Sequence, residues 1–217
     1  MATQNVINKF SQDLTIDPGA AGDSYTQFSI NGTGEFRIGV DDTDDSFRIS
    51  QGNALGTNDT FVMSAAGERT MPLQPSFGAY LSSTASDATG DNTDVQIAFD
   101  SEVWDQNSDY NAGLGRFTAP VDGCYLLSFT CRLLQVGAAH TAYFYKIVAI
   151  GVANFGVPGT NGNTKVGTLQ DNASWLIQMD AADIALVTIR VAYGTKIVDI
   201  YGGATDFITA FSGALVA

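Results

Sequence analysis

The sequence predicts an all-β protein, and three observations lead to that fold class. No window carries apolar residues at the spacings i, i+3, i+4 and i+7 of an amphipathic helix, and 23 glycines interrupt the chain. The run from Ile184 to Tyr193 is apolar and β-branched, as buried strands are. Apolar and polar residues alternate in residues 122–133, so that one strand face receives Tyr125, Leu127, Phe129, Cys131 and Leu133.

Residues 1–22 are predicted to form an N-terminal arm that ends in the turn-rich stretch Asp17–Asp23. The start of the arm lacks the basic residues and the apolar run of a signal peptide. We therefore expect synthesis in a cytoplasm without ordinary secretion. The apolar residues of the arm are the expected attachment points: Val6, Ile7, Phe10, Leu14 and Ile16.

Residues 23–71 repeat a short pattern in which an aromatic residue is followed two positions later by Ile or Met, and then by a turn. The pattern occurs in Gln27–Gly34, Glu35–Asp42, Ser46–Gly52 and Thr60–Gly67. Short ribbons of this kind are marginal in water and gain stability by stacking on neighbours or on other chains. We expect a β-rich stalk in an intertwined oligomer. A proline-containing linker, residues 72–75, would join it to a globular head domain, residues 76–217.

The end of the sequence predicts a strand that is buried in the globular core. Phe207, Phe211 and Leu215 have a spacing that puts them on one face of a strand. On a second predicted strand, Cys124 and Cys131 would lie ~23 Å apart and point to opposite faces. We therefore expect neither an intrachain disulfide nor a zinc site.

The composition argues against several partners. The chain has 23 Asp and Glu against ten Lys and Arg, for a net charge of −13 at pH 7. Binding to nucleic acid, or to an anionic membrane surface, needs clustered basic residues. No run of ~18 apolar residues that could insert into a membrane occurs. We expect no nucleic-acid partner and no membrane insertion, and the acidity is typical of a soluble surface.

The globular segment resembles the trimeric complement-type heads of the jelly-roll superfamily that includes tumour necrosis factor. Its residues 107–125 carry the most diagnostic motif, an aromatic residue before a turn and then Gly-x-Phe-x-x-Pro-x-x-Gly-x-Tyr. Four further segments are similar to strands of that superfamily: Phe77–Leu81, Val95–Asp100, Ala173–Asp180 and Phe207–Leu215.

The resemblance implies a ten-strand jelly roll that forms a homotrimer through aromatic and aliphatic faces. Ala181–Asp183 replaces the usual Gly-Asp turn, so no metal ligand is carried over from the superfamily. Independently of the resemblance, Gly115 and Gly123 stand where a turn needs positive φ or a close approach. The residues implied for core or trimer packing are Phe117, Tyr125, Phe129, Trp175, Phe207, Phe211 and Leu215.

The stalk segment is similar, over Arg37–Ser50 and Leu55–Asp59, to stretches of phage and prophage fibre or decoration proteins. The two resemblances together imply a structural protein at the virion surface. It would be a homotrimeric capsid decoration or cement protein whose arm binds the major capsid protein or another virion protein. The alternative is a trimeric tail-fibre or head-fibre protein that recognises a host-surface glycan or protein, because fold alone does not fix function.

No constellation of residues predicts an enzyme. The sole histidine, His140, fits a surface or hydrogen-bonded side chain better than a general base. Asp91, Asp105 and Asp109 are carboxylates of the type that glycosidases use, but nothing in the sequence pairs them across a cleft.

Two groups of residues remain as candidate binding sites. Carboxylate oxygens are ligands for calcium, and the chain clusters four of them, but at a spacing unlike that of a calcium loop. We expect a solvated turn there and no cofactor, with calcium as the other interpretation. The four residues are Asp41, Asp42, Asp44 and Asp45. Trp104 and Tyr110 lie in the loop-like stretch 101–111 and are predicted to be exposed aromatic contacts for a receptor.

Overall fold

The computed structural model describes residues 16–19, 21–160 and 167–217, and every regular element among them is a β-strand. The predicted all-β class is therefore confirmed. The chain divides into two compact units, residues 1–73 and 74–217. Among the described residues there is no helix with the length and apolar character of a membrane span.

Of the predicted attachment residues in the arm, only one lies in the described part of the chain. Ile16 is exposed there. The other four lie outside the described residues: Val6, Ile7, Phe10 and Leu14.

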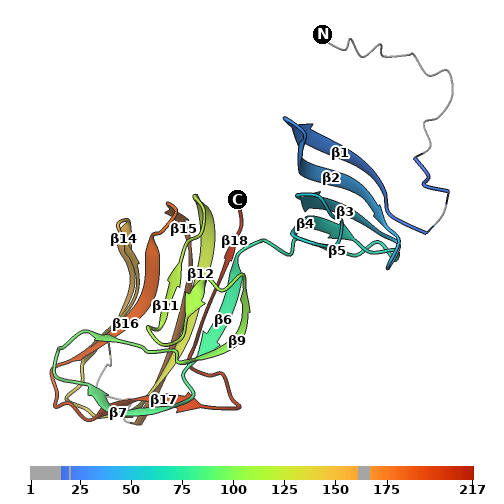
Figure 1. Cartoon of the computed structure of the whole chain (residues 1–217). Coiled ribbons are helices and arrows are strands. Elements are labelled where there is room, and N and C mark those ends of the chain that lie inside the picture. The colour runs from blue at the N-terminus through green and yellow to red at the C-terminus, as the bar shows by residue number, and fades with distance from the viewer. Residues whose placement is uncertain (1–15, 20, 161–166) are drawn as a thin grey trace. The chain divides into compact units, whose positions relative to one another are not determined.

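The first unit contains one antiparallel sheet in which each strand pairs with the next along the chain (Figure 1). Asn31 and Gly32 both have positive φ, which is the geometry of the two-residue hairpin turn that joins the first two strands. Among the described residues of this unit, Leu55 is the one buried apolar side chain. The strands are β1 (Ser24–Ile30), β2 (Thr33–Asp41), β3 (Ser46–Gln51), β4 (Asp59–Met63) and β5 (Arg69–Thr70).

The second unit is a sandwich of two antiparallel sheets. One sheet has the order β10 (Tyr110–Asn111), β11 (Arg116–Thr118), β16 (Ile184–Ala192), β13 (Ala142–Ile150), β14 (Ala153–Thr160), and β8 (Val95–Gln96) also pairs with β16. The other has the order β7 (Ser83–Thr89), β17 (Val198–Gly203), β12 (Gly123–Val136), β18 (Ala210–Leu215), β6 (Ser76–Tyr80), β9 (Ser101–Gln106), and β15 (Gly167–Met179) also pairs with β12. The architecture is that of a jelly-roll sandwich, as predicted.

Strand β12 lies at the centre of its sheet and confirms the predicted alternation. It pairs with β15 on one side and with β18 and β17 on the other. All five residues predicted for its inner face are buried. Cys124 and Cys131 both lie on this strand as free thiols, with Cys131 in the core and Cys124 on the opposite face. The hydrophobic burial along β12 thus fixes its register, because a shift of one residue would turn every one of these side chains to solvent.

Aromatic rings fill the core between the two sheets. The Phe77 ring stacks on Tyr110 and Phe117, with centroids 4.9 and 4.8 Å apart, and meets Phe211 edge-on at 5.0 Å. Tyr125 packs against Phe117. Because aromatic pairs stabilise a fold beyond the burial of their apolar surface, this cluster is a main source of stability in the second unit.

The diagnostic stretch is held in place by its glycines, as the sequence indicates. Gly115 has φ +60°, and a Cβ there would lie 3.1 Å from the Cα of Ala98. A Cβ at Gly123 would collide with the Leu215 side chain. Both positions therefore need glycine, one for its backbone conformation and one for a close approach.

Three expectations about strand positions are wrong. The closing strand begins at Ala210, and Phe207 lies before it with φ +46° and 46% of its surface exposed. The 101–111 stretch is not a loop, because Ser101–Gln106 forms β9 along β6. Of Val95–Asp100, only Val95–Gln96 is a strand, since Ile97 and Phe99 turn inward to the core instead of extending the ladder.

Candidate interaction surfaces

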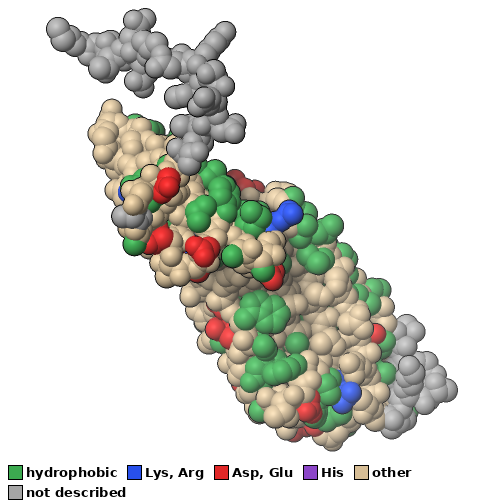
Figure 2. Space-filling model, turned by 90° about the vertical axis from the view of Figure 1, so that its right-hand side faces the viewer, with side chains coloured by type: hydrophobic (Ala, Val, Ile, Leu, Met, Phe, Trp, Pro, Cys, Tyr) green, Lys and Arg blue, Asp and Glu red, His purple; other side chains and the backbone are tan. Residues whose placement is uncertain are grey.

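The outer face of the sheet β15-β12-β18-β6-β9 carries two neighbouring rows of small, uncharged side chains with a few large apolar ones, and beyond these rows the charged Arg132 donates to Gln170 at 2.9 Å. The register places Gly78, Ser212, Ser128 and Ser174 in one row across the sheet. The neighbouring row runs through Ser76, Ala214, Leu126 and Leu176. These two uncharged rows differ from the surface expected of a strongly acidic monomer. Hydrophobic side chains also gather in patches elsewhere at the surface, and Figure 2 shows them in green.

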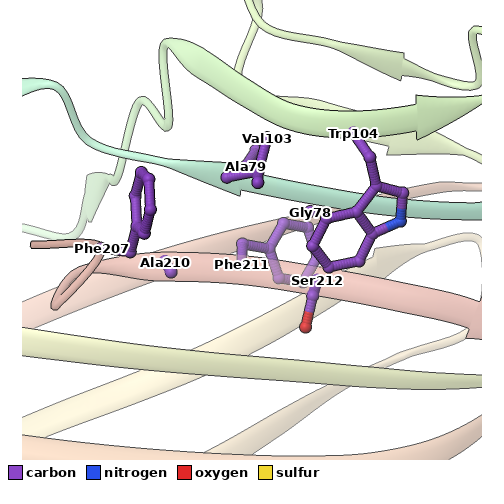
Figure 3. Close-up of a pocket in the computed structure, with 8 residues that line it drawn as sticks. All are labelled: Gly78, Ala79, Val103, Trp104, Phe207, Ala210, Phe211 and Ser212. Atoms are coloured by element: carbon purple, nitrogen blue, oxygen red, sulfur yellow. The ribbon is translucent and has the colours of Figure 1, made fainter. Parts of the chain in front are cut away.

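Trp104 lies across this face and divides it into two hollows. Its indole covers Gly78, where a Cβ would collide with the ring. On one side a hollow of about 210 Å³ extends to Phe207, and Figure 3 shows the two rings at its opposite ends. On the other side a hollow of about 260 Å³ extends over Ser128 to Leu126. Half of the Trp104 surface remains exposed, as predicted, but on a strand of the sheet and not in a loop.

Leu126 and Leu176 are surface residues that the sequence reasoning missed. They pair directly across β12 and β15 and are 42% and 61% exposed. The signal was present, because each leucine stands at an outward position whose neighbours on the same face are polar or small. A large apolar residue that breaks the alternation of a half-buried strand indicates a contact beyond the chain.

The other aromatic candidates, except Phe207, belong to the core. Tyr110 is not a receptor contact, since it is buried and its hydroxyl donates a hydrogen bond to the Phe99 carbonyl at 2.8 Å. Trp175 points inward and packs against Phe129 and Phe155. Phe117, Tyr125, Phe129 and Phe211 are buried, and Leu215 packs against them at the edge of the core. Phe207 is outside the core and meets Tyr80 edge-on at 4.6 Å.

His140 is a buried structural residue that ties its own loop to the loop that carries Thr195. The Gly137 N–H donates to its Nδ1 at 2.9 Å, so its Nε2–H donates to the Thr195 carbonyl at 2.9 Å. A Cβ at Gly194 would collide with the imidazole ring. With both ring nitrogens engaged and the ring 2% exposed, His140 is not placed to act as a general base.

The loops around His140 display an exposed aromatic residue, Tyr193. It has φ +71° and 74% of its surface exposed. Its neighbour Gly194 donates a backbone hydrogen bond to Gly90 at 3.1 Å. The loop that carries His140 follows the end of β12. The 14 residues of β12 span about 45 Å, and at the other end of this strand the Cys124 N–H donates to the Ala217 carbonyl.

The acidic cluster of the first unit surrounds an arginine. The Arg48 guanidinium contacts Asp41 at 3.2 Å, Asp44 at 2.6 Å, and also Asp59. The hydroxyl of Ser46, together with Arg48, holds the pKa of Asp44 below its ordinary value. A cationic side chain thus already balances two of the four residues considered for calcium.

The other two residues of that cluster, Asp42 and Asp45, lie on exposed turn positions. The carboxylates that converge are instead those of Asp23, Asp41 and Asp42, whose nearest oxygens lie within 4.8 Å of one another. Exposed carboxylates at this spacing are common without an ion, and the solvated turn remains the interpretation that these contacts favour.

The three carboxylates considered for glycoside hydrolysis do not face one another across a cleft. Asp91 caps its own turn by accepting from the Thr93 N–H. Asp105 accepts the N–H groups of Asp109 and Tyr110 at 3.1 and 3.0 Å. Burial, and then the nearby charge of Asp105, raise the pKa of Asp109 to about 6. This pair belongs to the turn after β9, and no described hollow opens onto it.

Comparison with known proteins identifies the second unit. A family model of the C1q domain matches residues 79–216. The chain belongs to the C1q domain family. The resemblance to complement-type heads is thereby confirmed, and we refer to residues 74–217 as the C1q-like head.

Solved structures are similar to the head at low sequence identity. The globular domain of zebrafish complement 1qA protein has 15% identity and a TM-score of 0.48, and the match covers 66% of this chain and 98% of that one. Murine APRIL has 11% identity and a TM-score of 0.45, with 66% and 99% covered. A search among curated proteins gives no match. C1q-like and tumour necrosis factor-like domains commonly form homotrimers and are typically non-enzymatic binding modules.

Proposed function

We propose that the protein is a homotrimeric structural component of a bacteriophage particle, a capsid decoration or cement protein that displays the C1q-like head at the virion surface. Residues 1–22 bind the major capsid protein or another virion protein. The observation that carries the proposal is the pair of uncharged rows on the outer face of β15-β12-β18-β6-β9, with Trp104, Leu126 and Leu176 exposed in them.

This face suits contacts between copies of an acidic chain. Like charges that meet across an interface cost binding free energy, and the chain carries a net charge of −13. The two rows consist of serines, one alanine, one glycine and three large apolar residues, and they avoid that cost. The trimeric habit of the C1q and tumour necrosis factor-like domains supports the same assembly. We accordingly assign Trp104 to contact between subunits instead of to a receptor.

The attachment end of the head follows from its hydrogen bonds. Gln74 donates to the Leu215 carbonyl at 2.8 Å, and the Leu215 N–H donates to Pro75 at 3.0 Å. The chain therefore enters the head beside the end of β18, at the end of β12 opposite to the His140 loops. A head tethered at its entry point presents those loops outward.

The oligomeric part of the proposal is tested by light scattering on the full chain. We expect three times the chain mass of 22.9 kDa. Leu176→Asp should yield a monomer, because it buries a carboxylate between subunits, whereas Tyr193→Asp, a matched exposed position at the other end of the head, should leave the trimer intact. A monomeric wild-type protein would refute the assembly.

The virion part is tested with purified empty capsids. Deletion of residues 2–22 should leave a soluble trimer that no longer sediments with capsids. Sedimentation that survives the deletion contradicts the attachment role of the arm.

A second function, recognition of a host-surface glycan by a fibre protein, is favoured by one observation. Tyr193 is exposed on loops that His140 holds rigidly, and exposed aromatic rings stack on sugars. Binding to host cells that Tyr193→Ala abolishes and Trp104→Ala leaves unchanged would favour the fibre protein over the decoration protein.

A further inference from the structure

The sheet β1–β5 of the first unit has one apolar face, and the repeated sequence pattern produces it. In three of the four repeats the aromatic residue and the apolar residue two positions later point to the same side, and cross-strand pairing aligns them. Phe36 lies opposite Phe28, Ile38 opposite Ile49, and Phe47 opposite Met63. The side chains of this apolar face are Phe28, Phe36, Ile38, Val40, Phe47, Ile49, Phe61 and Met63.

The opposite, polar face of the same sheet is closed by its own chain. Arg48 and its three aspartates lie on it, and Ser50 donates to Asp59 at 2.5 Å. The loop 52–58 folds over these groups, with Leu55 buried and the Gly56 N–H donating to Asp59 at 3.1 Å. The unit thus covers its charged face and leaves its apolar face open.

Within the first unit, no described segment covers the apolar face. Phe28 is 57% exposed, and Phe36 and Val40 are also exposed. The buried hydrophobic cluster of the molecule draws all its members from residues 77–211, so the apolar face contributes nothing to it. A single sheet gains its stability from packing its apolar face against a second layer.

We infer that the second layer is the same face of other copies of this chain, so that three sheets enclose one shared apolar core. The inference rests on the proposed homotrimer. The strand pairing places no carboxylate on the apolar face, since Asp41 and Asp59 lie on the other side of the sheet. The one charged residue that the register puts on this side is Arg69, which lies opposite Met63 on the edge strand β5. The face therefore lacks the negative charge that would separate copies of a chain at −13.

The short connection between the units makes copies of the chain the favoured occupant. Strand β5 ends at Thr70 and β6 begins at Ser76, so the link spans at most about 20 Å. Three joined heads would hold three apolar faces within that reach of the assembly, at an effective concentration of the order of millimolar. A separate partner would have to compete with that concentration.

The occupant is identified by photo-crosslinking in the full chain. The photoreactive residue p-benzoyl-phenylalanine replaces Phe36 on the apolar face or, as the matched control, Tyr25, which is exposed on the neighbouring strand but faces the other way. Equal amounts of ¹⁴N and ¹⁵N chains are mixed, unfolded, refolded together and irradiated. We expect crosslinks from position 36 to residues 24–63 of a chain with the other isotope, and none from position 25.

The other results overturn the inference in distinct ways. Crosslinks from position 36 to residues 1–22 of the same chain would show that the arm covers the face. A trimeric wild-type protein without crosslinks from position 36 between copies would refute the shared core while leaving the proposed homotrimer standing. A monomeric wild-type protein would refute both.

A second measurement covers the case in which the photoreactive residue disturbs the sheet. Phe36→Asp should keep the trimer mass, which the heads maintain, and should accelerate amide hydrogen exchange in residues 24–63 at least tenfold. Tyr25→Asp should also keep the trimer mass but should leave the exchange in residues 24–63 at the wild-type rate. Equal exchange in the two variants, with the mass unchanged, would also refute the shared core.

Discussion

In the C1q-like head, the apolar faces of two sheets pack against each other, whereas the sheet β1–β5 has only one layer and keeps its apolar face open. Both regions are built from strands with the same alternation of apolar and polar residues. The head has a buried cluster of 27 hydrophobic residues, and none comes from the first unit. Alternation therefore fixes which face is apolar, but the number of layers in the chain decides whether that face is buried.

The two regions also use their polar groups differently. In the first unit the buried polar groups form one network around Arg48. In the head the buried polar groups are dispersed, and His140 and Thr89 each serve a local loop contact. We therefore expect aromatic packing to dominate the stability of the head and ion pairing to dominate the internal stability of the first unit.

The largest effect should come from the aromatic core of the head. Phe77→Ala removes a ring that packs on three others, and the cavity should lower the free energy of unfolding of the head by about 3–5 kcal/mol. Both tryptophans lie in the head, so denaturant unfolding followed by tryptophan fluorescence measures it. Phe207→Ala should cost less than about 1 kcal/mol because that ring is half exposed. Equal losses for the two variants would contradict the core described here.

The next largest effect should come from the loss of Arg48, which should destabilise the first unit and leave the head unchanged. Arg48→Met leaves Asp41 and Asp59 buried without their cation, and should destabilise the first unit by about 3 kcal/mol. Hydrogen exchange should rise in residues 24–63 while the fluorescence transition of the head stays unchanged. Arg37→Met is the control, since Arg37 contacts exposed Gln27 and Tyr25. A shift of the head transition would show that the two units unfold together.

The comparison also explains how far the sequence could predict this structure. Strand β12 was predictable because its buried face repeats every second residue without a break from Tyr125 to Leu133. Phe207 was misplaced because a turn at positive φ interrupts the same spacing, and spacing alone carries no signal for it. Tyr110 was misplaced because its burial depends on Phe77 and Phe211, which are distant in the sequence.

The candidate surfaces were harder to predict than the fold. Trp104 could be identified as exposed, but its place on a sheet face depends on the pairing of β9 with β6. The apolar face of the first unit has a visible source in the sequence, since the repeat itself places Phe36 and Ile38 on one side. Cross-strand neighbours set the remaining geometry, and a single sequence does not specify them.

A smaller effect tests the outer face of the head. Gly78→Ala places a Cβ against the Trp104 ring and should displace the indole, at a cost of about 1–2 kcal/mol. We expect a red shift of tryptophan emission and weaker association of the head. Gly137→Ala is the matched control, because a Cβ there would lie at an ordinary 3.5 Å from His140. An unshifted spectrum in Gly78→Ala would contradict the position of the indole.

The smallest effect is one of pH. Burial, and then the charge of Asp105, raise the pKa of Asp109 to about 6, above its value in the unfolded chain. The folded state then binds more protons between about pH 4 and 6, so ionisation of Asp109 removes stability as the pH rises through that window. Asp109→Asn avoids this loss. It should be more stable than the wild type above pH 6, by about 1 kcal/mol after screening by solvent, and the advantage should vanish near pH 4.

Asp91 is the control for this prediction, because its pKa is shifted in the opposite direction. Although burial opposes it, hydrogen bonding from Thr93 lowers the pKa of Asp91, so the wild-type carboxylate stabilises the fold at neutral pH and loses that contribution as the pH falls. Asp91→Asn should therefore be less stable than the wild type at pH 7 and approach it in acid. Thermal unfolding of both variants between pH 2 and 8 measures the two differences. A stability difference for Asp109→Asn that does not change with pH would show that the variant acts through packing, because only a perturbed ionisation confines the effect to this window.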